Sequence, residues 1–319
     1  MLITTSQLPE YKGHLVSLQG RLVGLTRRIA RNGRAYFRLK LADSAGSTEA
    51  FVWPEAPLYD FIETIDVREQ HLVEMSGRVA QLNGYFNLRL SEVYIVSSSF
   101  VQNGAALLPL PMVPVRARDS LSWLIKFIDE LDNEPLRAFL TDILVDPAIG
   151  HRFVRSRASG SYHSAYPGGL LVHSVEVAQL AGEWAARLNE SRLSIAVTQV
   201  GGLLHDLGKI DTVGEGNPRP MSPSLYDHEI QTVHLLAQHI KRLTETARIE
   251  GMVMHHLIGR LASSPRYYKS QTMAEELIRF ADQASAGHQQ KQTIEQFIKR
   301  LPQQPSNDNS FHSVVRGNS

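Results

Sequence analysis

Residues 201–209 read GGLLHDLGK, and this short stretch decides how the second half of the chain is interpreted. An apolar helical pattern leads directly into His205 and Asp206. A buried imidazole or carboxylate is costly unless it is paired or bound to a metal. Adjacent side chains on a helix point about 100° apart, so both can reach one ion only near a helix end. We expect Gly208 to provide that end.

Two further polar residues interrupt apolar helical stretches on either side of this pair. His173 lies in GGLLVHSVEVAQLA (168–181), and Asp282 lies in LIRFADQASAG (277–287). The chain has 13 histidines, ten of them between residues 150 and 290, and no cysteine. A thiolate ligand, a cysteine nucleophile and a disulfide scaffold are therefore excluded. Imidazole and carboxylate groups from separate helices can build a nitrogen and oxygen cage for a divalent metal.

Helical periodicity extends over the second half of the chain. From about Ser120, apolar residues follow the spacing i, i+3, i+4, i+7 of a helix face. Similar faces recur at 170–189, 192–207, 226–243, 245–257, 271–286 and 290–300. We therefore expect an all-α domain over residues 120–301, followed by a polar, disordered tail at 302–319.

The first hundred residues show strand patterns instead. YFRLKLAD (36–43) alternates strictly between apolar and polar residues. Asn83-Gly84 is a strong signal for a short hairpin between two further strands. Five short strands, with a helical segment near 58–65, predict a small Greek-key barrel over residues 1–100. The proline-rich stretch that follows predicts a linker at 101–119.

Basic and aromatic residues gather in this predicted barrel. Between Arg21 and Lys40 there are seven Lys or Arg residues and no acidic residue. Such a face suits single-stranded nucleic acid, because guanidinium groups pair with phosphates and rings stack on bases. The alternative is that the aromatic side chains belong to the barrel core. The residues expected to face outward and bind nucleic acid are Arg34, Tyr36, Arg38 and Trp53. The segment AYFRLKLADSAGSTEAFVW resembles the OB-fold of nucleic-acid-binding proteins.

The helical half resembles the HD-domain metal-dependent phosphohydrolases through the pattern H…HD…D and the flanks GGLLxH and LLHDLGK. The resemblance implies a first metal held by His173, His205, Asp206 and Asp282. It implies a second metal held by Asp206, His228 and His255, with His256 as the alternative to His255. Two metal ions suit phosphodiester hydrolysis, because they activate a bridging water and stabilise charge on the phosphoryl oxygens.

Other polar residues near these motifs are candidates for substrate contacts. Lys209 follows the His-Asp pair and can reach a phosphate, unless it is a solvated lysine at a helix end. His163 is expected to line the same cleft, so that Asp206, Lys209 and His163 form the catalytic set. Arg155 and Arg157 are candidates for contacts to a nucleic-acid backbone, or simply surface residues.

The order of OB-fold and HD domain, together with HSAYPGGLLVHS, LLHDLGK and MHH, resembles the YhaM-type 3′–5′ exoribonucleases over nearly the whole chain. This implies trimming of single-stranded RNA, and in places DNA, with Mn²⁺ as the first choice of metal and Mg²⁺, Fe²⁺, Co²⁺ or Ni²⁺ as alternatives. Similar segments occur in HD-type relaxases, so a DNA-nicking nuclease of a mobile element is an alternative. Two others are a nucleotide phosphohydrolase whose barrel serves only assembly, and a binding module with a degenerate site.

Composition narrows the class of protein further. Hydrophobic residues make up 43% of the 319 residues and charged residues 20%, so the chain can bury a core. A net charge of +1 excludes a globally basic coat for nucleic acid. The N-terminus lacks the pattern of a signal peptide, and no apolar run approaches the roughly 20 residues of a membrane span. We expect a cytoplasmic protein without a membrane partner, and a homo-oligomer is allowed.

Overall fold

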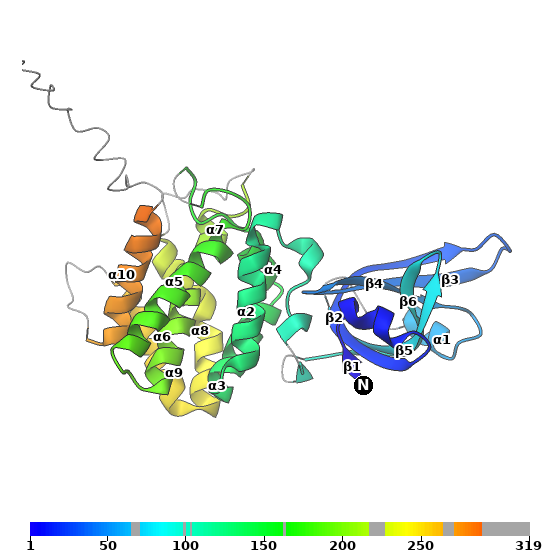
Figure 1. Cartoon of the computed structure of the whole chain (residues 1–319), viewed down its shortest axis with the longest axis horizontal. Helices are drawn as coiled ribbons and strands as arrows, with labels where there is room; N and C mark the ends of the chain where they lie inside the picture. The colour runs from blue at the N-terminus through cyan, green and yellow to red at the C-terminus, as the bar shows by residue number, and fades with distance from the viewer. Residues whose placement is uncertain are drawn as a thin grey trace, which may run out of the picture.

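The computed structural model describes residues 1–64, 71–97, 100–102, 104–161, 164–216, 227–263 and 271–288. Its two halves differ in class, with a β-barrel on one side and a bundle of helices on the other (Figure 1). The expected helical face at 290–300 and the expected tail at 302–319 lie outside the described residues. Within the described parts of the chain, none of the helices combines the length and apolar character needed to cross a lipid bilayer.

The N-terminal half is a closed five-stranded barrel, which confirms the predicted fold class. The strands are β2 (Leu15–Ile29), β3 (Ala35–Asp43), β4 (Gly46–Val52), β5 (Leu72–Leu82) and β6 (Tyr85–Ile95). A short β1 (Leu2–Ile3) pairs in parallel with β2, a 3-10 helix η1 (Thr5–Tyr11) follows it, and α1 (Leu58–Thr64) lies between β4 and β5 in the sequence. The long β2 closes the barrel by pairing with both β3 and β5. A register shift between Leu22 and Gly24 lets it bend.

Strand alternation in the barrel follows the sequence pattern. Phe37, Leu39 and Leu41 are buried in the barrel core, because alternate side chains of β3 point inward. The β5–β6 hairpin turns at Asn83 and Gly84, whose φ angles are 51° and 82°. Two positive φ angles are typical of the two-residue turn that the Asn-Gly pair predicts.

The C-terminal half is helical. Its helices are α2 (Arg118–Glu130), α3 (Glu134–Val145), α4 (Gly150–Arg155), α5 (Gly169–Arg187), α6 (Arg192–Leu204), α7 (Lys209–Thr212), α8 (His228–Thr246), α9 (Arg248–Leu261) and α10 (Met273–His288). One apolar core joins residues from α2 through α10. Helices α5, α6 and α10 pack side by side, and α8 lies against α9 (Figure 1).

The stretch expected to be a linker packs between the two halves. It forms short 3-10 turns, η3 (Gly104–Ala106), η4 (Leu110–Met112) and η5 (Val115–Ala117), and it buries Leu107 and Leu108. Arg21 of β2 is only 6% exposed at this joint. Its Nε donates to the carbonyl of Leu107 at 3.2 Å, and its Nη2 donates to two carbonyls at the C-terminal end of α3. Arg21 therefore belongs to the joint and not to an exposed basic face.

Candidate metal centre

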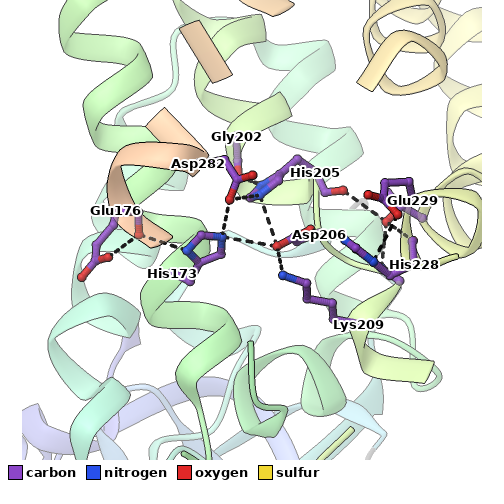
Figure 2. Close-up of polar contacts among 12 residues, drawn as sticks. His173, Glu176, Gly202, His205, Asp206, Lys209, His228, Glu229 and Asp282 are labelled. Atoms are coloured by element: carbon purple, nitrogen blue, oxygen red, sulfur yellow. Dashed lines mark hydrogen bonds and ion pairs between the residues drawn. The ribbon is translucent and has the colours of Figure 1, made fainter. Parts of the chain in front are cut away.

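Helices α5, α6 and α10 bring together the residues that the H…HD…D pattern singled out. His173 is fully buried on α5, His205 is the C-terminal cap of α6, and Asp282 lies on α10. One ligand atom from each of these residues and from Asp206 lies within 4.8 Å of the others (Figure 2). Four nitrogen and oxygen donors at this spacing can hold one divalent metal.

The turn after α6 lets adjacent His205 and Asp206 act at one point. Helix α6 ends at Leu204, and Gly208 is the N-cap residue of the short α7, which begins at Lys209. Gly208 has right-handed angles (φ −60°), so its role is close approach and not a left-handed helix end. A Cβ there would lie 2.0 Å from the carbonyl oxygen of His228. The amide of Gly208 also donates to Oγ1 of Thr232 at 2.8 Å. The turn is thereby packed against the first turns of α8.

This packing places His228 against the opposite side of Asp206. Nε2 of His228 lies 3.1 Å from Oδ1 of Asp206, whereas His173 and His205 both lie 3.3 Å from Oδ2. Nδ1 of His228 faces Oε2 of Glu229 at 3.1 Å. A carboxylate with different imidazoles at its two oxygens has the arrangement of a bridging ligand. Figure 2 shows Asp206 between the two groups.

The hydrogen bond of His205 indicates that its second nitrogen is available to a metal. Nδ1 lies 2.8 Å from the carbonyl oxygen of Gly202, which can only accept, so Nδ1 carries a proton. Nε2 is buried and makes no hydrogen bond of good geometry among the described residues. It faces carboxylate oxygens of Asp206 and Asp282 at 3.3 and 3.7 Å. Nitrogen and carboxylate lone pairs that point at one another require a cation between them, and these residues therefore fit a metal.

The pKa shifts of His205 and Asp206 also indicate that the site suits a cation. Burial alone lowers the pKa of His205, but the charges of Asp206 and Asp282 outweigh it and raise this pKa to about 10. Burial likewise raises the pKa of Asp206, yet His205 and Lys209 hold it well below its ordinary value. Nζ of Lys209 forms an ion pair with Oδ2 of Asp206. The buried carboxylate of Asp206 and the partly exposed one of Asp282 thus favour positive charge between them, which protons and Lys209 supply when no metal is bound.

The remaining predicted residues of the helical half lie elsewhere. His255 is exposed on α9, and His256 faces Glu275 of α10 at 3.0 Å. Neither joins a cluster of potential ligands within the described ranges. Arg155 pairs with Glu215 at 2.8 Å. The main-chain amide of Arg157 donates to the carbonyl of Gly214 at 3.0 Å, and its guanidinium lies beside Gly216. His163 lies outside the described residues.

Sequence reasoning missed the residues that orient the histidines. The carbonyl of Gly202 accepts from His205, the carboxylate of Glu229 lies beside Nδ1 of His228, and Thr232 fixes the approach of α8. The spacing of Gly202 to His205 and the adjacency of Glu229 to His228 were the available signals. No sequence signal pointed to Thr232, because its hydrogen bond with Gly208 depends on how α8 packs against the turn after α6.

Of the residues predicted to face outward, Tyr36 and Arg38 lie on β3, Arg34 directly precedes β3, and Trp53 directly follows β4. The rings of Tyr36 and Trp53 stack with centroids 4.8 Å apart, and Arg34 lies 6.0 Å above Trp53. Arg34 pairs with Glu55, and Arg38 pairs with Glu49. A neighbouring cleft of about 420 Å³ is lined by Lys40, Phe51, Tyr85 and Asn87, among others. The face is therefore aromatic, with its two arginine charges balanced by acids.

Comparisons with known proteins match a family model to part of the helical half. A family model described as HD domain matches residues 170–287. Solved structures similar to the chain include a domain of replication protein A from Methanococcus maripaludis, 18% identical, covering 30% of this chain and 97% of that chain with a TM-score of 0.25. Asparaginyl-tRNA synthetase from Entamoeba histolytica is 13% identical, covering 59% of this chain and 35% of that chain, also with a TM-score of 0.25. These distant likenesses do not bear on what the barrel binds. Residues 170–287 form an HD domain, which indicates a metal-dependent phosphohydrolase with His173, His205, Asp206 and Asp282 as its candidate metal ligands.

Proposed function

We propose that this protein is a metal-dependent phosphodiesterase that removes nucleotides from the 3′ end of single-stranded RNA or DNA. The observation that carries the proposal is the position of Asp206. Its Oδ2 faces His173 and His205, its Oδ1 faces His228, and the site belongs to an HD domain. A bridging carboxylate of this kind is typical of sites that hydrolyse phosphodiesters with two cations.

The ligands divide into two groups around Asp206. His173, His205, Asp206 and Asp282 would hold the first cation, and Asp206 with His228 would hold the second. Mn²⁺ is our first choice, because the resemblance to the YhaM-type exoribonucleases implies it, and Mg²⁺, Fe²⁺, Co²⁺ or Ni²⁺ are alternatives. When bound, such cations supply a water of lowered pKa and stabilise charge on the phosphoryl oxygens.

In this proposal Lys209 pairs with Asp206 when no metal is bound and contacts the substrate when metal is bound. Its side chain is 12% exposed and pairs with Asp206, so a bound cation would compete with it for the same carboxylate oxygen. Released from Asp206, the ammonium group can hold a phosphate oxygen of the substrate. His163, Arg155 and Arg157 remain candidates for contacts to the terminal nucleotides.

The barrel would bind the single strand upstream of the cleaved end. The stacked Tyr36 and Trp53 offer an aromatic surface, and Trp53 is 39% exposed. Stacking of a base on such a ring contributes about 1–3 kcal/mol. Since Arg34 and Arg38 already pair with acids, we expect stacking to contribute more of the affinity than phosphate contacts do.

Hydrolysis of end-labelled strands tests the proposed reaction. We expect single-stranded RNA or DNA in Mn²⁺ to be shortened stepwise from a free 3′ end, with mononucleotides released and stalling at duplex. A circular single strand should resist. Cleavage of the circle at the rate of a linear strand would instead favour the DNA-nicking alternative, and release of phosphate from free nucleotides alone would favour a nucleotide phosphohydrolase.

A matched pair of variants tests the second cation. His228→Ala removes the imidazole at Oδ1 of Asp206, so we expect one cation fewer per chain and most of the rate lost. His256→Ala removes an imidazole that faces Glu275, so the metal content should stay the same. Equal metal content in the wild type and His228→Ala would show that His228 is no ligand.

A further inference from the structure

Behind His173, on the side away from the carboxylates, lies a short hydrogen-bonded chain. Nδ1 of His173 is 3.0 Å from Oγ of Ser285, and this hydroxyl donates to Oε2 of Glu176 at 2.7 Å. Ser285 is 7% exposed, and His173 is fully buried. Figure 2 shows Glu176 and His173 joined through this contact, with Asp206 and Asp282 on the far side of the imidazole.

The chemistry of the three side chains determines which atom donates in each of these two hydrogen bonds. A serine hydroxyl has one proton, and an ionised carboxylate can only accept, so the proton of Ser285 goes to Glu176. Oγ of Ser285 must then accept from His173, which fixes the proton of the imidazole on Nδ1. The lone pair of Nε2 is left facing Asp206 at 3.3 Å and Asp282 at 3.1 Å.

Helices α5 and α10 each contribute two residues to this arrangement. His173 and Glu176 are three residues apart on α5, and Asp282 and Ser285 are three residues apart on α10. Side chains at this spacing share a helix face. Each helix thus presents one metal ligand and one residue that orients the histidine, so the packing of α5 against α10 builds both together. His205 differs, since its Nδ1 donates to an uncharged carbonyl.

We propose that Ser285 and Glu176 are positioning residues that set the tautomer and ring orientation of His173 for a metal. The negative charge of Glu176 makes the oxygen of Ser285 a better acceptor for the proton on Nδ1, which raises the electron density on Nε2 and makes it a better metal ligand. This inference rests on the metal centre of the proposed function, but not on the substrate or direction of hydrolysis.

Metal affinity of the full chain tests the proposal without an activity assay. Mn²⁺ alone is titrated into the metal-free protein at fixed pH against a competing chelator. Ser285→Ala should bind Mn²⁺ about 10–100-fold more weakly than the wild type. Glu176→Gln should also bind more weakly, and Ser285→Thr, which keeps the hydroxyl, should restore most of the affinity. Gln283→Ala on α10 and Glu183→Gln on α5 change exposed neighbours and should bind like the wild type.

The tautomer is measured separately by nitrogen-15 NMR of the histidine rings in the Zn²⁺-loaded protein. The wild type should show a slowly exchanging proton on Nδ1 of His173, and Glu176→Gln should speed its exchange. If Ser285→Ala fails to fold, the loss of affinity in Glu176→Gln alone decides the matter. Wild-type affinity in folded Ser285→Ala and Glu176→Gln would overturn the inference but leave the metal centre intact. A wild type that binds no metal would overturn the metal centre and the proposed function as well.

Discussion

Asp206 is the residue on which the candidate site depends most. It is 4% exposed, and both its oxygens face imidazoles from different helices. A buried carboxylate in this position has a high desolvation cost that four nearby cationic or metal-binding groups can offset. Changing it to a neutral amide should therefore affect every other ligand.

We predict that Asp206→Asn loses bound metal and hydrolysis together. The amide keeps the size of the side chain but lacks the negative charge that attracts cations. The rate should fall by more than the roughly 10–100-fold typical of residues that only support a ligand. Elemental analysis and a single-turnover assay measure both effects, with Asp211→Asn on α7 as the control. An Asp206→Asn protein with full metal content and full rate would refute the metal assignment.

The ligand set was predictable from sequence because polar residues stood alone in apolar helical stretches. The partners that orient them were not. Ser285 and Glu176 read as ordinary residues of α10 and α5, and only the packing of the two helices joins them to His173. The pair His255-His256, which the family resemblance implies as a source of a second-metal ligand, joins no cluster of potential ligands among the described residues, and His256 faces a buried glutamate.

Glu275 gives the helical half a pH-dependent contribution to stability. The side chain is 1% exposed and faces His256 at 3.0 Å and the backbone amide of Gln271 at 3.2 Å. Burial alone raises the pKa of Glu275, but these donors and Arg260 outweigh it and hold the pKa below its ordinary 4.5. The folded state thus favours the ionised form. The resulting stabilisation is complete above pH 4.5 and is lost as the pH falls through the lower, folded-state pKa.

We therefore predict that the melting temperature of the wild type falls more steeply than that of Glu275→Gln as the pH drops from about 5 to 3. Glu276→Gln, at an exposed neighbouring position, should follow the wild type. Thermal unfolding followed by circular dichroism at half-unit steps of pH measures the slopes. Parallel slopes for the wild type and Glu275→Gln would contradict this role.

At the scale of elements, the long periodic stretches were predicted well and the short connections were not. The faces expected at 192–207 and 271–286 correspond to α6 (Arg192–Leu204) and α10 (Met273–His288). Short helices such as α4 and α7 have too few residues to show a period. The end of α6 was expected from Gly208, but the glycine acts through the space it leaves for α8.

We predict that Gly208→Ala displaces α8 from the turn that carries Asp206. The added Cβ would meet the carbonyl of His228 at 2.0 Å and the amide of Thr232 at 2.6 Å. The variant should lose about 1–3 kcal/mol of unfolding free energy, as overpacking commonly costs, and His228 should leave Asp206. Gly259→Ala on α9 is the control, because its Cβ meets nothing within 4 Å. Urea unfolding and bound-metal content measure the two effects; equal values for both variants would contradict the prediction.

At the scale of the whole molecule, ion pairs with acidic residues reduce the positive charge expected on the surface of the barrel. The run from Arg21 to Lys40 contains no acid, so its sequence alone predicts a basic surface. In three dimensions Glu49 and Glu55 pair with Arg38 and Arg34, and Arg21 turns away into the joint. Sequence patterns give the faces of β3, but not which acids later strands bring beside them.

Arg21 also links the barrel to the helical half. Its guanidinium donates to the carbonyls of Leu107, Leu144 and Val145, and so ties β2 to the joint and to the end of α3. Carbonyls at the C-terminal end of a helix carry partial negative charge, which suits a buried cation. Burial nevertheless lowers the pKa of Arg21, against a smaller opposing effect of Asp146, to about 10.

We predict that Arg21→Met loosens the barrel from the helical half. Buried carbonyls left without a donor should cost about 1–3 kcal/mol of unfolding free energy. A nucleic acid bound to a loosened barrel would no longer be held in line with the metal centre, so hydrolysis of long single-stranded nucleic acids should fall. Hydrolysis of a small phosphodiester such as bis(p-nitrophenyl) phosphate should persist, because it needs only the helical half. The ratio of the two rates is therefore the measurement, with Arg187→Met on α5 as the control. An unchanged ratio and an unchanged stability in Arg21→Met would mean that the barrel serves the active site without being fixed to it.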